Sequence, residues 1–211
     1  MISETLKRVI VAYATEKDDT FHRFLDSLSS EELRDAFLDL LNLYSNDKNS
    51  SKIRELVTLW ISGFEPSPGK LGYNGFRIDG GAAKCEVKPK NTESTKKKLR
   101  GEGSFNDYTY ERLEKDIKEN PTVLVSGFVL GKLLYIMSFE FRCLESHLKS
   151  LLDKRFRGKP RQAGEYLRSA QFSFKDYVNC QSLRIVYLRD NWQAFKEYIS
   201  KDLVKFFESY E

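Results

Sequence analysis

Residues 75–91 read GFRIDGGAAKCEVKPKN, and the rest of the chain is organised around this stretch. Its first residues alternate between apolar and polar side chains, which is the pattern of a β-strand. Gly80-Gly81 then supplies a turn that tolerates positive φ. After the turn, Cys85 and Val87 alternate with charged residues, so a second strand has one apolar face and one charged face. The stretch therefore predicts a tight β-hairpin.

The charged face of the second strand carries Lys84, Glu86 and Lys88. If Asp79 ends the first strand on the same face, then Asp79, Glu86 and Lys88 converge. Two carboxylates suit Mg²⁺, which prefers oxygen ligands and usually keeps several waters. A lysine beside such an ion can orient an attacking water and offset the charge of a scissile phosphate. The hairpin therefore predicts a magnesium site.

An aspartate followed after a short gap by Glu-x-Lys on adjacent strands resembles the active site of the PD-(D/E)XK nuclease superfamily. Type II restriction endonucleases and mismatch-repair nicking enzymes belong to that superfamily. Six residues separate Asp79 from Glu86, a spacing that looks like that of the mismatch-repair group, and Ile78 stands where many members have proline. The resemblance covers roughly residues 70–140. It implies an α/β (α+β) fold, in which a mixed central β-sheet carries the catalytic hairpin and is flanked by helices.

The activity implied by this resemblance is that of a Mg²⁺-dependent type II restriction endonuclease. Such an enzyme hydrolyses phosphodiester bonds of double-stranded DNA at a specific site as a homodimer and leaves 5′-phosphates. Asp79, Glu86 and Lys88 would be catalytic, and the metal would be held by Asp79, Glu86 and the carbonyl of Val87. Glu55, on the helix expected before the hairpin, is a candidate extra carboxylate.

Two basic segments are candidate DNA contacts. The first follows the hairpin directly, and its position predicts that it tracks phosphates, although a solvated surface loop is the alternative. In the second, residues 142–168, eight Lys/Arg stand against three acidic residues, and arginine and glutamine can read base edges. A basic surface turn is the alternative there. The candidate contacts are Lys90, Lys96, Lys97, Lys98, Arg100, Arg155, Arg157, Lys159, Arg161 and Gln162.

Charge is divided unevenly along the 211 residues. Residues 1–50 have a net charge of −4, whereas the remainder has +8. An acidic N-terminal part attached to a basic body fits a protein that presents a positive face to a polyanion. The N-terminal part could be a dimerisation element, a lid, or helices packed on the sheet, and the last is favoured.

Cysteine usage and hydropathy bear on the compartment. Cys85, Cys143 and Cys180 are an odd number without CxxC spacing, which argues against a disulfide framework or a zinc site and for a reducing compartment. No window approaches the about 20 apolar residues that span a bilayer, and no signal-peptide pattern is visible. We therefore expect a cytoplasmic protein without membrane contact.

One nuclease domain is expected over residues 1–211. It comprises a helical N-terminal part (1–65), a catalytic sheet core (70–141) and a DNA-contact segment with strands and a C-terminal helix (142–211). Helices are predicted at 3–14, 19–28, from 29 or 30, 51–63, 107–119, 142–153 and 192–209. Further strands are predicted at 122–130, 133–141, 172–178 and 182–188.

Other chemistries find little support. The chain has no Walker loop, no GxGxxG and no GxSxG. His22 and His147 belong to no metal or triad pattern, so we expect both to be structural. Two alternatives to a restriction enzyme stay open: a structure-specific or repair nuclease of the same superfamily, and a non-catalytic nucleic-acid-binding module whose basic loops do the work.

Overall fold

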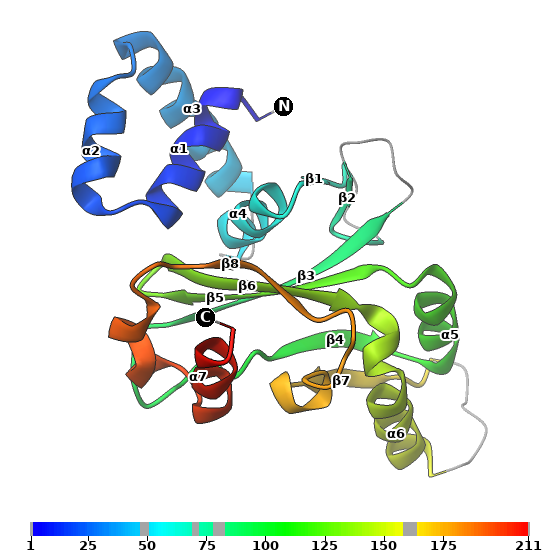
Figure 1. Ribbon diagram of the computed structural model, residues 1–211. Coiled ribbons are helices and arrows are strands. Elements are labelled where there is room, and N and C mark those ends of the chain that lie inside the picture. The colour runs from blue at the N-terminus through cyan, green and yellow to red at the C-terminus, as the bar shows by residue number, and fades with distance from the viewer. Residues whose placement is uncertain (1, 47–50, 69–71, 78–82, 158–163, 211) are drawn as a thin grey trace.

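A six-stranded mixed sheet forms the centre of the protein (Figure 1). The computed structural model describes residues 2–46, 51–68, 72–77, 83–157 and 164–210. The strand order is β1-β2-β3-β5-β6-β8, and all neighbours are antiparallel except β3 and β5, which are parallel. The mixed sheet predicted from the sequence is therefore confirmed. The strands of this sheet are β1 (Phe64–Pro66), β2 (Gly75–Arg77), β3 (Lys84–Thr92), β5 (Thr122–Val129), β6 (Lys132–Glu140) and β8 (Arg184–Leu188).

Helices cover the sheet on both faces (Figure 1). On one face lie α1 (Glu4–Thr15), α2 (Asp18–Asp26), α3 (Ser30–Asn46) and α4 (Lys52–Ile61). On the other lie α6 (Glu145–Phe156), α7 (Lys201–Glu208) and a two-stranded ribbon of β4 (Gly103–Tyr108) and β7 (Leu167–Phe172). The helix α5 (Tyr110–Glu119) leads into β5. The helices predicted in the N-terminal third and at 142–153 are confirmed, apart from small differences at their ends.

Alternation along β3 separates the two faces, as predicted. Cys85 and Val87 are buried in a cluster with Leu59 of α4, Phe64 and Leu124. Even-numbered residues of β3 point to the opposite face, where the larger core lies between the sheet, the β4–β7 ribbon, α6 and α7. The polar residues of β3 are therefore directed toward the ribbon and α5.

Helix α5 leads into β5, and a tight turn joins β5 to β6. Thr109 caps α5 by accepting a hydrogen bond from the amide of Arg112 (3.2 Å), and Asn120 ends the helix in the left-handed region. At the far end, Leu130 and Gly131 both have positive φ, which is the geometry of a type I′ hairpin turn. The turn was predicted at Gly131-Lys132, one residue later.

The β4–β7 ribbon was not predicted. Residues 107 onward were expected to form a helix with Asn106 or Asp107 as its cap, but both residues lie in β4 and the helix begins at Tyr110. Asp107 has φ 51°, a left-handed conformation inside β4, but the β4–β7 register is the same on both sides of it. The strand predicted at 172–178 is also wrong, because β7 ends at Phe172 and the 3₁₀ turn η2 (Phe174–Asp176) follows.

The predicted C-terminal helix at 192–209 is broken. A 3₁₀ segment, η3 (Trp192–Tyr198), precedes α7, and Ile199 between them is extended. Leu99 donates its amide to the carbonyl of Tyr198 and accepts from the amide of Ser200, both at 2.8 Å. This long-range bridge fixes the interruption, and Ser200 then caps α7.

Cysteine pairing differs from the expectation. Cys143 and Cys180 form a disulfide across 37 residues, with Cα atoms 5.7 Å apart. The argument against disulfide bonding is therefore wrong for this pair, and the cysteines no longer support a reducing compartment. Cys85 is free and buried, and burial raises the pKa of its thiol to about 12. No helix within the described ranges has the length and apolar character needed to cross a bilayer.

Thiol counting tests this pairing. Protein purified without reductant should show one reactive thiol when denatured and three after reduction, and none in the native state at pH 8 because Cys85 is buried and protonated. Reduction, or Cys143→Ser, should lower the free energy of unfolding by about 3–4 kcal/mol for a loop of this length. Three thiols in the denatured, unreduced protein would contradict the disulfide.

Candidate active site

Glu86 and Lys88 form an ion pair on β3, on the face that points toward the β4–β7 ribbon. Lys88 Nζ lies 2.8 Å from Glu86 Oε1, and the exposed fractions of the two side chains are 15% for Lys88 and 9% for Glu86. Lys88 Nζ also lies 4.5 Å from the centre of the Phe105 ring, a cation–π contact. Burying a carboxylate costs free energy unless a nearby cation and hydrogen bonds compensate its charge. Lys88 is both a cation and a hydrogen-bond donor for Glu86. The predicted convergence of these two residues is confirmed.

Asp79 lies outside the described residues, so its approach to Glu86 stays a prediction. The described part of the hairpin pairs Gly75 with Cys85 and Phe76 with Lys84. The amide of Arg77 donates to the carbonyl of Ala83 at 3.1 Å. The pairing of the hairpin is therefore confirmed up to Arg77 and from Ala83 onward, but the predicted faces of its first strand are wrong. Phe76 lies opposite Lys84 on the charged face and is 43% exposed, whereas the Arg77 guanidinium lies 6.0 Å from the buried Phe64 ring, on the face of Cys85.

At Val87, the edge of β3 that faces away from β5 pairs with a side chain and not with another strand. β2 begins at Gly75, and Asn74 Oδ1 accepts a hydrogen bond from the amide of Val87 at 2.9 Å. In an extended strand, the N–H and C=O of one residue point to the same side, so the Val87 carbonyl points to this edge and not to β5. Pro89 has no N–H, but its nitrogen faces this same edge, so no hydrogen bond to β5 is lost. This direction is compatible with the ligand role predicted for the Val87 carbonyl.

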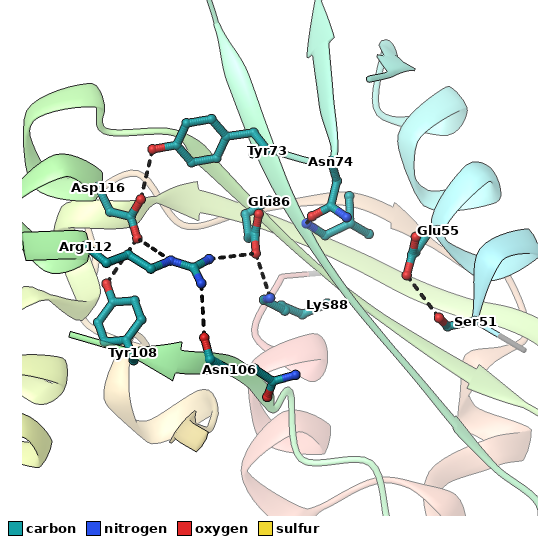
Figure 2. A network of polar contacts seen from close by, with 11 residues as sticks. Ser51, Glu55, Tyr73, Asn74, Glu86, Lys88, Asn106, Tyr108, Arg112 and Asp116 are labelled. Atoms are coloured by element: carbon teal, nitrogen blue, oxygen red, sulfur yellow. Dashed lines mark hydrogen bonds and ion pairs between the residues drawn. The ribbon is translucent and has the colours of Figure 1, made fainter. Parts of the chain in front are cut away.

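A second polar group adjoins the pair and was not predicted (Figure 2). Arg112 of α5 lies with Nη2 3.9 Å from Glu86 Oε1 and with Nε 3.6 Å from Asp116 Oδ2. Asp116 also accepts hydrogen bonds from the hydroxyls of Tyr73 (2.9 Å) and Tyr108 (3.1 Å). The i, i+4 spacing of Arg112 and Asp116 is visible in the sequence, but the two tyrosines join them only through the tertiary fold.

Burial raises the pKa values of Asp116 and of the two tyrosines that donate to it. Asp116 is 4% exposed, and its burial raises the pKa of the carboxyl above the ordinary 3.8, although the Tyr73 hydrogen bond and Arg112 oppose the shift. Burial and the Asp116 carboxylate raise the pKa values of Tyr73 and Tyr108. Both hydroxyls therefore remain hydrogen-bond donors throughout the neutral range.

Glu55 lies apart from these residues. Its Oε1 accepts a hydrogen bond from the Ser51 hydroxyl at 3.0 Å, and both residues belong to the start of α4 (Figure 2). Within the described part of the chain, no hydrogen bond or ion pair joins Glu55 to Glu86 or Lys88. Its role as an extra carboxylate stays a prediction.

Most of the first basic segment lines an open groove of about 630 Å³, the basic groove. Six Lys/Arg side chains line the groove, together with only two carboxylates, those of Glu102 and Asp176. His147, expected to be structural, forms part of the wall and contacts Asp176 (3.2 Å) and the carbonyl of Gln171 (2.7 Å). The basic residues of the groove are Lys90, Lys96, Lys97, Lys98, Arg100 and Lys175.

The basic groove adjoins the Glu86–Lys88 pair. Lys88 and Lys90 are two residues apart on β3 and so lie on the same face. Gly103 of β4 lies between Lys88 and Phe172, a groove residue. A Cβ atom at Gly103 would come within 2.8 Å of Lys88 Cγ and 2.5 Å of the Phe172 ring. Only glycine lets β4 approach β3 this closely. Glu86 and Lys88 do not line the groove themselves, and they are linked to it through Lys90 and Phe172.

The second basic segment is only partly described. Arg155 is exposed in the last turn of α6, and Arg157 ends that helix in the left-handed region. Lys159, Arg161 and Gln162 lie outside the described residues. Neither described arginine lines the basic groove. DNA contacts from this segment stay predictions.

Comparison with known proteins adds no relative: no family model matches the chain, and no curated protein matches it. In the parts of the chain that the structure describes, no three His, Cys, Asp or Glu side chains are grouped closely enough to hold a metal ion. The case for a metal therefore depends on Glu86, the Val87 carbonyl and the undescribed Asp79.

The buried carboxyl of Asp116 predicts a distinct pH dependence. Its pKa is raised on folding, so between about pH 3.8 and the raised value the folded state binds more protons than the unfolded state. The free energy of unfolding should therefore fall, relative to that of Asp116→Asn, as pH rises through this window. Urea unfolding of both proteins at several pH values between 4 and 7 measures the difference.

Asp153→Asn is the matched control. A hydrogen bond from Tyr110 lowers the pKa of Asp153, so its carboxylate stabilises the folded state at higher pH and loses that effect as pH falls through the lowered value. The two variants should deviate from the wild type in opposite directions as pH rises. Parallel curves for the wild type and Asp116→Asn would refute the assignment.

Proposed function

We propose that the chain is a Mg²⁺-dependent endodeoxyribonuclease of the type II restriction class, which cuts double-stranded DNA at a specific site. The observation that carries the proposal is the Glu86–Lys88 ion pair on a central strand, on the same face as Lys90, which lines the basic groove. The parallel and antiparallel neighbours of β3 and the helices on both faces agree with the fold that the PD-(D/E)XK resemblance implies.

Mg²⁺ would be held by Asp79, Glu86 and the carbonyl of Val87, and when bound it would stabilise negative charge on the phosphate oxygens. Glu86 fits this role because it is a hard oxygen donor whose burial is already compensated. Lys88 would orient the attacking water and offset charge on the scissile phosphate. The water oxygen loses a proton as it adds to phosphorus, the bond to the 3′ oxygen breaks, and that oxygen takes up a proton from solvent. The products are a 5′-phosphate and a 3′-hydroxyl.

The basic groove supports DNA as the substrate, since exposed lysines beside a reaction site can follow a phosphate backbone. Cleavage of both strands at one site requires two active sites, which a homodimer would supply. An enzyme acting on DNA in this way would work in the cytoplasm. The six-residue gap between Asp79 and Glu86 also suits a repair nickase, which cuts only one strand.

Plasmid cleavage tests the proposal. With Mg²⁺ the wild type should give discrete fragments, and EDTA should abolish them. Glu86→Gln and Lys88→Ala should lower the cleavage rate on the order of 10²-fold or more, because each removes a group at the reacting phosphate. Asp79→Asn should do the same. Glu114→Gln, on an exposed position of α5, is the control and should cleave like the wild type.

The products separate the candidate functions. Nicked circles without linear product would identify a nickase, and cleavage confined to branched DNA would identify a structure-specific nuclease. DNA retention without cleavage of either substrate, at any Mg²⁺ concentration, would refute the enzyme and leave a binding module. Full activity of Glu86→Gln would refute the proposed site.

Salt dependence tests the groove. The triple variant Lys96→Ala, Lys97→Ala, Lys98→Ala should bind duplex DNA more weakly, and its slope of log affinity against log salt should be smaller by about 0.9 for each phosphate that is no longer neutralised. Lys118→Ala, Lys201→Ala, Lys205→Ala removes the same charge from exposed positions outside the groove. Equal slopes for the two triple variants would exclude the groove as the DNA path.

A further inference from the structure

Arg112 is fixed on three sides and still reaches the surface. Its Nη1 donates to the carbonyl of Asn106 at 3.1 Å, and its Nε lies 3.6 Å from Asp116 Oδ2. The guanidinium carbon lies 5.9 Å from the Phe105 ring centre and 5.4 Å from that of Tyr108. The side chain is nevertheless 38% exposed. The contacts therefore hold the guanidinium in one place without covering it.

The guanidinium and Lys88 share one partner. Lys88 Nζ lies 2.8 Å from Glu86 Oε1, whereas Arg112 Nη2 lies 3.9 Å from the same oxygen. At 3.9 Å the second contact is an ion pair and not a hydrogen bond. A guanidinium has five N–H donors, so its contacts with Asn106, Asp116 and Glu86 leave donors of Arg112 available beside Glu86. Both cations also lie against the same aromatic ring, that of Phe105.

The helix itself does not explain an arginine at this position. Arg112 is in the first turn of α5, where the helix dipole disfavours a positive charge. The order Arg112 then Asp116 is also the less favourable orientation for an i, i+4 ion pair. Asp116 is buried, and two tyrosine hydroxyls converge on it. This arrangement orients Arg112 at a cost to the helix, which points to a ligand for the guanidinium.

We propose that Arg112 binds a non-bridging oxygen of the phosphate that is attacked beside Glu86 and Lys88, and that Asp116 positions the guanidinium for this contact. The proposal rests on the proposed nuclease function and adds a second cation to its site. Tyr73 and Tyr108 keep Asp116 in place. The negative charge that accumulates on the phosphate during attack would lie between Lys88 and Arg112.

The identity of the cation matters for this role. A guanidinium is planar and can be oriented by some of its donors while another binds the ligand, whereas a lysine ammonium is a single point charge on a flexible chain. Nη1 and Nε are already directed toward Asn106 and Asp116, so the plane of the guanidinium is set before the substrate arrives. We therefore expect lysine to replace Arg112 poorly.

Steady-state cleavage of a duplex that contains the recognition site tests the role of Arg112. Arg112→Ala and Arg112→Lys should each lower kcat on the order of 10²-fold, with a much smaller change in KM. Asp116→Asn should lower kcat less, because Arg112 remains. Millimolar guanidinium chloride should partly restore Arg112→Ala, which a merely structural loss would not allow. Lys118→Ala, on the same helix, should match the wild type and show no response to guanidinium.

The outcomes separate this inference from the proposed function. If Glu86→Gln is inactive but Arg112→Ala cleaves like Lys118→Ala, the nuclease stands and the role of Arg112 is refuted. If Arg112→Ala fails to fold, the kcat of Arg112→Lys decides in the same way. If the wild type binds DNA without cleaving it, the proposed nuclease activity is refuted. In that case, equal DNA affinities of Arg112→Ala and Lys118→Ala would also refute the contact between Arg112 and a phosphate. A wild type that neither cleaves nor binds DNA overturns both proposals.

Discussion

The burial of one carboxylate constrains the whole centre of this protein. Glu86 lies on β3 in the middle of the sheet, where an isolated negative charge would cost several kcal/mol. Lys88, two residues along the same strand, compensates it at 2.8 Å, and Arg112 adds a second positive charge from α5. Period-2 alternation makes the first contact local to β3. The second contact requires that α5 and β4 be placed correctly, so the polar site around Glu86 depends on the packing of these elements against β3.

Placement of β4 depends on the way the ribbon packs. Gly103 has no side chain, which lets β4 lie against Lys88 and Phe172. Phe105, two residues further on, presents its ring to both Lys88 and Arg112. Asp107, with φ 51°, precedes Tyr108 at the end of β4, and Thr109 then caps α5. A short segment, 103–112, thus supplies the floor of the polar site and one of its cations, and it joins the site to the basic groove.

Sequence patterns within a single strand were enough to predict strands such as β3 and β5. The alternation around Cys85 and Val87 identified β3 and its two faces, and the apolar run at 122–130 identified β5. The ribbon was missed because β4 and β7 are about 60 residues apart and their pairing leaves only a weak pattern in either strand. The Tyr73–Asp116 hydrogen bond and the Cys143–Cys180 disulfide join residues 43 and 37 positions apart. Neither spacing carries a local signal, so the second half of the polar site could be found only in the folded chain.

The Asp116 group argues for a purpose beyond stability. A buried ion pair seldom stabilises a fold more than well-packed apolar residues of the same size would. Here one buried carboxylate takes two tyrosine hydroxyls and the Nε of an arginine, while the outer part of that arginine stays exposed beside Glu86. If only packing were required, leucine at position 116 and phenylalanine at positions 73 and 108 would serve without the desolvation cost. What such a core could not do is hold a guanidinium in a fixed plane next to a buried carboxylate, and a guanidinium held in this way suits the phosphate contact proposed for Arg112.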